Sequence, residues 1–149
     1  VKEVMPDAFI GVDVIVGTRG ETDEYFEQAY EFIRDLDVTQ LHVFSYSERP
    51  GTQALKIDHV VTPGEKHRRS QRLLGLSDEK TRAFYVRHIG QTMPVLLERP
   101  KAGAPMHGFT ANYIRVEVPH HDALDNQVVS VRLGDFNEDG TALQGTLLL

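Results

Sequence analysis

The sequence predicts two domains: an α/β unit built on parallel strands over residues 1–87, and a small all-β antiparallel barrel over residues 88–149. Three observations lead to this fold class. A β-branched run leads into a glycine loop and a capped helix, a second strand follows that helix, and beyond Ile89 short β-like runs alternate with turn signals. With 149 residues, of which 40% are hydrophobic, the chain is large enough to bury a core.

The first β-like run lies within Gly11–Thr22, which reads GVDVIVGTRGET. Val12–Val16 is apolar and mostly β-branched and predicts a strand, whereas Gly17–Gly20 predicts a loop that can approach a ligand closely. Thr22 is the predicted N-cap of a helix whose first turn carries two carboxylates. Ligands of α/β folds bind where such loops leave parallel strands, so this loop is a candidate site, with a plain connecting loop as the alternative.

A helix and a second strand follow. Apolar residues recur at helical spacing over Asp23–Leu36, which predicts an amphipathic helix. Val38–Tyr46 then contains a β-rich run, and the order strand, helix, strand predicts a βαβ unit with parallel strands. Before the first strand, Val1–Pro6 is predicted to close a helix.

The third segment of the α/β unit is a polar loop and a long basic helix. Ser45–Thr52 emerges at the same edge as the glycine loop and is rich in hydroxyls. Thr62, Pro63 and Glu65 match a capping box and predict the start of the helix, which Gly75–Ser77 could interrupt.

The predicted barrel is built from short runs with turn residues between them, such as those at Asn137–Gly140. Their spacing predicts a barrel with five strands or a similar number. The runs are Gln91–Glu98, Gly108–Val118, Gln127–Leu133 and Thr141–Leu148.

The net charge of −6 conceals a basic middle. Residues 1–60 hold 12 acidic and 5 basic side chains, whereas residues 61–100 hold 4 acidic and 8 basic ones. This band predicts an anionic partner, with a solvated helix face as the alternative. The chain has no cysteine and can therefore form no disulfide and no cysteine-ligated iron–sulfur cluster.

No apolar run approaches the roughly 18 residues of a membrane span, and no signal-peptide pattern is visible. We therefore expect a cytoplasmic protein with no membrane partner. Because the chain begins at Val1 rather than Met, we expect it to be a piece of something longer.

Three stretches together resemble the C-terminal part of the radical S-adenosylmethionine (SAM) methylthiotransferases. DVIVGTRGET is similar to the late-strand motif of that family, which usually has Pro where this chain has Arg19. LHVFSYSERPGTQA, at Leu41–Ala54, is similar to the family's F-x-Y-S-x-R-x-G-T-x-A signature. GFTANYIRV, at Gly108–Val116, resembles the core of the TRAM domain, an OB-like RNA-binding barrel. The second and third stretches are most similar to the branch that acts on threonylcarbamoyladenosine beside the tRNA anticodon.

The resemblance implies that the full-length protein is a tRNA-processing transferase that adds a methylthio group to a hypermodified adenosine. It would use SAM and two 4Fe-4S clusters. Residues 1–87 would then be the remnant of a partial radical-SAM barrel. The cluster domain and the three-cysteine loop of the family are missing from this chain, so we expect it to hold no cofactor and to be catalytically inactive alone.

Other functions stay open at this point. The isopentenyladenosine branch shares most of these motifs, and the branch that modifies a ribosomal protein shares the architecture. Outside the family, the chain could be a stand-alone RNA-binding protein or a small nucleotide-binding α/β protein.

The resemblance also implies candidate site residues. In this family the late strand and the next one wall the adenosine end of SAM, so cofactor contacts are implied for Val14, Val16, Gly17, Phe44 and Tyr46. The alternative for these side chains is barrel core. Among the substrate-binding candidates, Arg49 stands beside hydroxyls at the end of a strand, where a guanidinium can bind a carboxylate or phosphate, with Glu48 or another acid of the loop as the alternative partner.

tRNA is the predicted macromolecular partner. Further substrate-binding residues are expected on the basic helix, where several cations can face successive phosphates, and on the barrel. They are Arg68, Arg69, Arg72 and Arg115. Phe109 and Tyr113 could also stack on RNA, although strand alternation favours a core position for Tyr113 and a surface position for Arg115.

No catalytic residue and no metal site is predicted. His120 and His121 are adjacent, so on a strand they would point to opposite faces. Finally, the two parallel strands would lack their barrel neighbours, and unpaired strand edges recruit other chains. We therefore predict that the chain self-associates through its exposed sheet edges.

Overall fold

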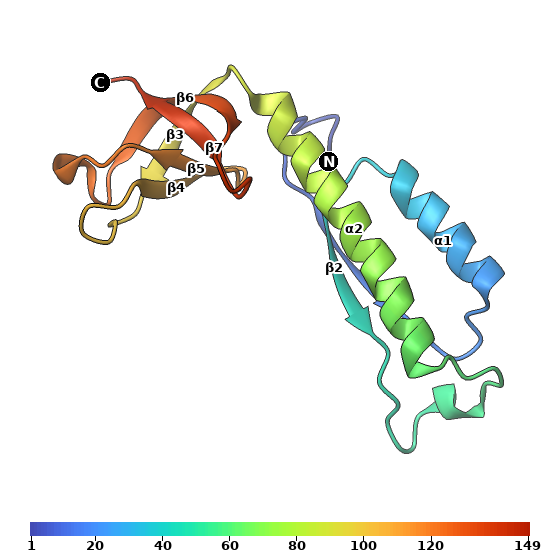
Figure 1. The fold of residues 1–149 in the computed structure, drawn as a ribbon. Helices are drawn as coiled ribbons and strands as arrows, with labels where there is room; N and C mark the ends of the chain where they lie inside the picture. Colours follow the sequence, from blue (N-terminus) through green and yellow to red (C-terminus); the bar gives the residue numbers. More distant parts are fainter. The chain divides into compact units, whose positions relative to one another are not determined.

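The computed structural model describes all of residues 1–149, and its contacts divide the chain into two compact units. The α/β unit is Ile10–Arg82, and the barrel unit joins Val1–Phe9 to Ala83–Leu149 (Figure 1). Each unit has its own hydrophobic core. The predicted domain limits at residues 87 and 88 stay a prediction.

The α/β unit contains the predicted strand–helix–strand arrangement. Its elements are β1 (Gly11–Val16), α1 (Asp23–Asp35), β2 (Gln40–Ser45), a short 3₁₀ turn η1 (Gln53–Lys56) and α2 (Pro63–His88), whose last residues count with the barrel unit. β1 and β2 pair in parallel, which confirms the predicted βαβ unit. The N-cap at Thr22 is also confirmed, because its hydroxyl accepts the backbone N–H of Tyr25 at 3.2 Å.

Helices α1 and α2 run alongside the sheet (Figure 1) and cover one of its faces. Val16 and Leu41 from the strands pack there against Phe26 of α1 and against Leu73 and Leu76 of α2. The opposite face carries no helix, and parallel sheets in folded proteins are normally covered on both faces.

Two local predictions were wrong. Val1–Pro6 forms isolated turns rather than a helix, because one or two turn hydrogen bonds cannot offset the cost of helix nucleation. Helix α2 runs without a break through Gly75–Ser77. One glycine weakens a helix by only about 1 kcal/mol, and here the Ser77 hydroxyl bonds the backbone N–H and C=O of Leu41, which anchors the segment on β2.

The barrel unit contains a closed five-stranded barrel in the order β3-β4-β5-β7-β6. The strands are β3 (Thr92–Leu97), β4 (Met106–Thr110), β5 (Arg115–Val118), β6 (Val128–Phe136) and β7 (Leu143–Leu147), with a 3₁₀ turn η2 (Asp122–Leu124) before β6. The predicted small barrel is confirmed, with two corrections. β5 and β7 pair in parallel, since closure brings them together, and the single run predicted over Gly108–Val118 is two strands joined by a tight turn.

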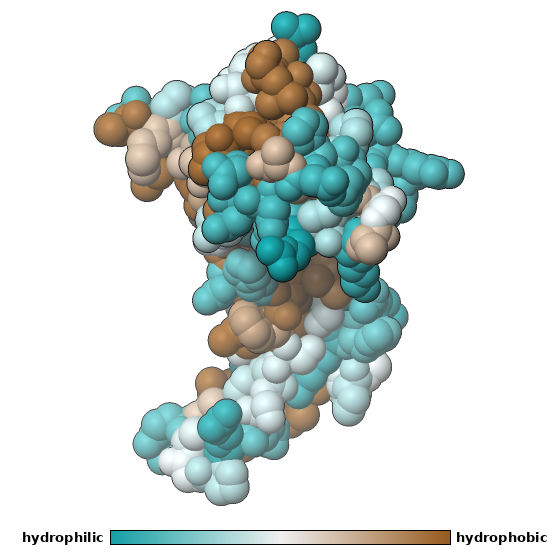
Figure 2. Space-filling view, turned by 90° about the vertical axis from the view of Figure 1, so that its left-hand side faces the viewer, coloured by the Kyte–Doolittle hydropathy of each residue, from teal (hydrophilic) through white to brown (hydrophobic).

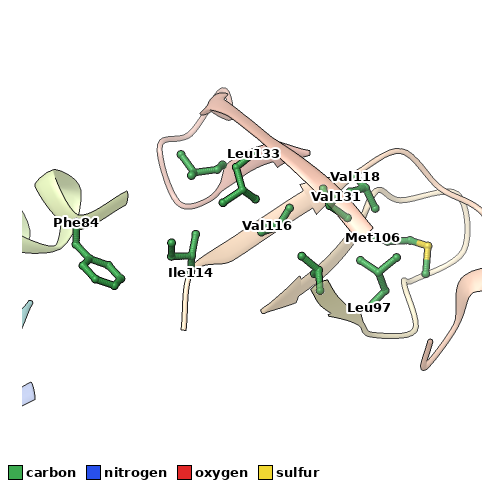
Figure 3. Packing of buried hydrophobic residues seen from close by; sticks show 10 residues of the cluster. Phe84, Leu97, Met106, Ile114, Val116, Val118, Val131 and Leu133 are labelled. Atoms are coloured by element: carbon green, nitrogen blue, oxygen red, sulfur yellow. The ribbon is translucent and has the colours of Figure 1, made fainter. Parts of the chain in front are cut away.

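The barrel interior is filled by aliphatic side chains. Figure 3 shows Leu97, Met106, Val116, Val118 and Val131 lying together inside the barrel, and all of them are buried. Two glycines, Gly108 and Gly145, sit where an added Cβ atom would overlap neighbouring atoms of the barrel. The close packing at these positions therefore depends on the absence of a side chain.

Candidate functional site

The first candidate surface is the edge of the sheet where β1 and β2 end. Gly17 has a φ of 79°, which favours glycine, and its N–H donates to Glu21 Oε1 at 2.9 Å. A Cβ atom at Gly17 would overlap the aliphatic stem of Lys66. Lys66 Nζ in turn donates to the Tyr46 carbonyl at 3.1 Å and lies 5.4 Å from the centre of the Tyr46 ring. Lys66 thus joins Gly17 to Tyr46, a role that the sequence pattern did not reveal.

The loops after β1 and β2 are tied together by Arg19, the residue that departs from the family motif. Its Nε donates to Glu48 Oε1 at 2.8 Å, and its Nη1 donates to the Leu55 carbonyl at 2.8 Å. The hydrogen bond from Arg19 lowers the pKa of the Glu48 carboxyl. Because Glu48 is engaged by Arg19, it does not pair with Arg49, whose guanidinium is exposed in the loop.

The five residues with implied cofactor contacts do not share one surface. Val14 and Val16 point into the core beneath the helices. Phe44 lies on the opposite, uncovered face, where it is 55% exposed beside its register partner Ile15, which is 58% exposed. Side chains alternate between the two faces of a strand, so odd and even positions of β1 cannot line the same site. Ile15 was missed, although this alternation was a signal that could have found it.

Arg69 of α2 is buried, with its side chain only 4% exposed, and it is surrounded by acids of the α/β unit. Its guanidinium nitrogens lie 2.8 Å from Glu21 Oε1, 2.8 Å from Asp23 Oδ1 and 3.0 Å from Glu65 Oε1. A further hydrogen bond reaches the Glu21 carbonyl. With these contacts, the side chain holds the start of α1 to the first turns of α2.

Other cations of α2 also have partners within the α/β unit. Arg72 forms a bidentate ion pair with Glu27, and this pair lowers the pKa of the Glu27 carboxyl. The Arg72 guanidinium also lies over the Tyr30 ring, 4.5 Å from its centre. Arg68 pairs with Glu65 and stays exposed. Lys80 donates to the Leu36 carbonyl at 2.7 Å, and burial lowers its pKa. Much of the basic band therefore stabilises the fold itself.

The second candidate surface lies on the barrel. Arg115 Nη1 donates to Thr141 Oγ1 at 3.2 Å, and that hydroxyl donates to Asp139 Oδ1 at 2.6 Å. This second hydrogen bond lowers the pKa of Asp139, and the positive charge of Arg115 helps to lower it, without a direct ion pair between the two side chains. Tyr113, for which alternation favoured a core position, is 67% exposed. The core expectation was wrong because Tyr113 lies in the turn between β4 and β5, where strand alternation does not apply.

Neither unit presents a metal-binding cluster: no group of three or more His, Asp or Glu side chains is arranged to hold an ion. His120 Nε2 instead lies 2.6 Å from Asp122 Oδ1, and this hydrogen bond raises the pKa of the exposed His120. None of the helices is both long enough and apolar enough to cross a bilayer.

No protein-family model matches the chain. Among curated proteins, it is 30% identical over its whole length to a tRNA-2-methylthio-N(6)-dimethylallyladenosine synthase from Symbiobacterium thermophilum, of which it covers 33%. It is 34% identical to a protein of the same name from Desulfitobacterium hafniense, over 92% of this chain and 31% of that one. It is also 30% identical to the threonylcarbamoyladenosine tRNA methylthiotransferase MtaB of Bacillus subtilis, over 89% of this chain and 30% of that one.

The chain thus spans about a third of the length of the curated relatives that it matches. Relatives named for two different adenosine substrates match at similar identity, so the comparisons do not distinguish between the two branches. The resemblance drawn from the three motifs and the similarity across the chain agree. The chain belongs to the tRNA methylthiotransferase family, and it corresponds to the C-terminal part of that family's proteins.

Proposed function

We propose that this chain is the C-terminal part of a radical-SAM enzyme that adds a methylthio group to a hypermodified adenosine of tRNA, with threonylcarbamoyladenosine as the favoured substrate. The observation that carries the proposal is the similarity to tRNA methylthiotransferases across the whole chain. The closed five-stranded barrel supports it, because small barrels of this OB-like kind bind oligonucleotides.

The α/β unit fits the role of the last part of a partial radical-SAM barrel. Its two-stranded parallel sheet has helices on one face and the apolar side chains Ile15 and Phe44 on the other. In the proposal, Phe44, Tyr46 and Gly17 contribute part of the SAM pocket, while Val14 and Val16 support it from the core. SAM would supply the reactive radical chemistry, and these residues would bind and orient its adenosine end.

Analysis of tRNA nucleosides tests the proposed function directly. In a strain that lacks the parent gene, mass spectrometry should show threonylcarbamoyladenosine without its methylthio group. Loss of the methylthio group from isopentenyladenosine instead would assign the other tRNA branch. If every tRNA methylthio group persists, a ribosomal-protein substrate or a stand-alone RNA-binding role takes the place of this proposal.

We expect the chain to self-associate through the uncovered face and the open edges of its two-stranded sheet. Replacing Phe44 with Glu should reduce association, because a charge on that face opposes its burial against a second copy. Light scattering over a wide concentration range measures this. The expectation would be contradicted if the chain without substitutions were monomeric while its α/β unit was ordered. Phe32→Glu, on the exposed side of α1, is the matched control and should leave association unaltered.

For tRNA binding, the exposed cations of the α/β unit are the ones we propose to meet phosphates. Replacing Arg49 and Arg68 together with Gln should weaken tRNA binding and reduce the dependence of log Kd on log salt by about two, since each phosphate contact contributes about one. Filter binding at several salt concentrations measures this slope. Replacement of His120 and His121 with Gln should leave it unaltered; an unaltered slope in the arginine variant would make these cations a solvated surface only.

A further inference from the structure

An open groove of about 380 Å³ crosses the outer surface of the barrel. Figure 2, which looks toward the side of the barrel, shows brown apolar side chains among the teal polar ones. The side chains that line the groove and matter here are Leu96, Glu98, Phe109, Tyr113 and Val128. Four of these five are large hydrophobic residues that are more than 40% exposed, an arrangement that is unusual outside binding surfaces.

The strand register explains how three of the apolar side chains come together. Val128 of β6 is opposite Leu96 of β3, and Leu96 is opposite Phe109 of β4. Phe109 is in turn opposite Arg115 of β5. Directly paired residues point to the same face, so these four side chains form one row across the outside of the barrel, with a cation at its end.

Tyr113 adds a second ring to this row from the turn between β4 and β5. The Phe109 and Tyr113 ring centres are 6.5 Å apart, with an angle of 62° between the planes. Tyr113 has a φ of 65°, in the left-handed region where Gly or Asn is favoured. A tyrosine at such a position is strained, and it places an exposed ring beside the groove. Strained positions of this kind occur preferentially at binding sites.

The charges around the groove narrow the kind of occupant. No lysine or arginine lines it, and its charged group is the exposed carboxylate of Glu98. A phosphate inside the groove would be repelled by that carboxylate, whereas an exocyclic amino group would donate to it. Arg115, at the end of the row, donates to the Thr141 hydroxyl and lies close enough to the Asp139 carboxylate to help the Thr141 hydrogen bonds lower its pKa, but it forms no direct ion pair and can bind a phosphate there.

We propose that this groove holds one unpaired nucleobase of RNA that carries an exocyclic amino group, adenine or cytosine, stacked on the Tyr113 ring with its edge against Phe109, and with the adjoining phosphate at Arg115. The inference rests on the proposed function, for which it names the base-contacting site. Aromatic rings that stack on bases beside a cation are the common device of single-strand binding barrels.

Short single-stranded oligonucleotides test the inference with the complete chain. The probes are oligoadenylate, oligouridylate, and oligoadenylate in which abasic nucleotides replace the bases. Tyr113→Gly should weaken oligoadenylate binding about tenfold, since stacking on one ring contributes a factor of this order. The melting temperature of the variant should change little, because glycine adopts the left-handed conformation without strain and this gain offsets the loss of the ring contact with Phe9, whose centre lies 5.8 Å from that of Tyr113.

Further variants separate stacking from charge. Arg115→Gln should reduce the salt dependence of binding by about one phosphate contact, whereas Tyr113→Gly should leave it unaltered. Glu98→Gln should reduce the preference for oligoadenylate over oligouridylate. Tyr25→Ala, which removes a similarly exposed ring from α1, is the control and should leave oligonucleotide binding unaltered.

Equal binding of the abasic and the ordinary oligonucleotide, or unaltered binding by Tyr113→Gly, would overturn the inference and leave the groove to an apolar protein segment. The nucleoside analysis is independent of this test. If the groove variants lose RNA binding as expected while tRNA methylthiolation does not depend on the parent gene, the base site stands and the proposed enzyme fails. If tRNA methylthiolation depends on the parent gene while the groove variants bind RNA as the unaltered chain does, the base site is ruled out and the proposed enzyme stands.

Discussion

Replacing Arg69 with Met is expected to destabilise the α/β unit by about 3–5 kcal/mol, the range observed when one member of a buried ion cluster is removed. The methionine would fill part of the space but would leave the partly buried carboxylate of Glu21 without its cation and would leave Glu65 with Arg68 as its remaining partner. Hydrogen exchange of the β1 and β2 amides measures the opening free energy of this unit. Exchange of the barrel amides should be unaffected, because the contacts of Arg69 described here all lie within the α/β unit.

The neighbouring residue provides a matched control. Arg68 is on the same helix and pairs with the same Glu65, but its side chain is 69% exposed. Exposed pairs contribute about 0–1 kcal/mol, so Arg68→Gln should leave amide exchange almost unaltered. If Arg69→Met were as mild as Arg68→Gln, the carboxylates around Arg69 would have to be accessible to water, and the structural role assigned to Arg69 would be wrong.

Replacing Gly108 with Ala is expected to destabilise the barrel by about 2–3 kcal/mol or more, since overpacking in a rigid interior costs this much. The added Cβ atom would overlap the backbone carbonyl of Leu96 and would lie 2.9 Å from Val95 Cγ1. A backbone atom cannot move aside as a side chain can, so β3 and β4 would have to separate at the Leu97–Gly108 pair. Hydrogen exchange of β3 and β4 amides measures the loss.

Gly75→Ala is the control variant, for which we expect a change in stability of the opposite sign. Gly75 is exposed in the middle of α2, with no atom within 4 Å of the position of an added Cβ. Alanine there should stabilise the helix by about 0.5–1 kcal/mol, because it restricts the unfolded chain. A stabilised or unaltered Gly108→Ala variant would mean that the two strands tolerate a shift in register at this point.

The basic helix α2 has fewer free cations for RNA binding than its sequence indicates. Charge counting along the sequence predicts a band of cations over residues 61–100, but the structure engages several of them within the protein. Arg69 and Arg72 have carboxylate partners, and Lys80 caps the end of α1. Attraction of an anionic partner depends on the charge left over after such pairs form, so the basic helix should attract phosphates less strongly than the charge count predicts.

The sequence by itself determined most of the elements and the family. Local signals were sufficient for the parallel pair and the N-cap at Thr22, because hydrophobic periodicity and capping depend on residues close together in the chain. The motif resemblance identified the family, as the similarity to tRNA methylthiotransferases across the whole chain agrees. Periodicity did not predict the turn that follows Thr110, which ends the alternation of β4 and contains the positive φ of Tyr113.

Tertiary structure alone decided which candidate side chains share a surface. The row from Val128 to Arg115 exists only because closure of the barrel sets the register of four strands. The partners of Arg69 lie 48, 46 and 4 positions away, at Glu21, Asp23 and Glu65, and no local pattern reports such an arrangement. Burial and charge pairing depend on contacts between distant segments. For this reason the sequence could identify the candidate arginines, but only the tertiary structure showed that Arg49 and Arg68 are exposed whereas Arg69 is buried and supports the fold.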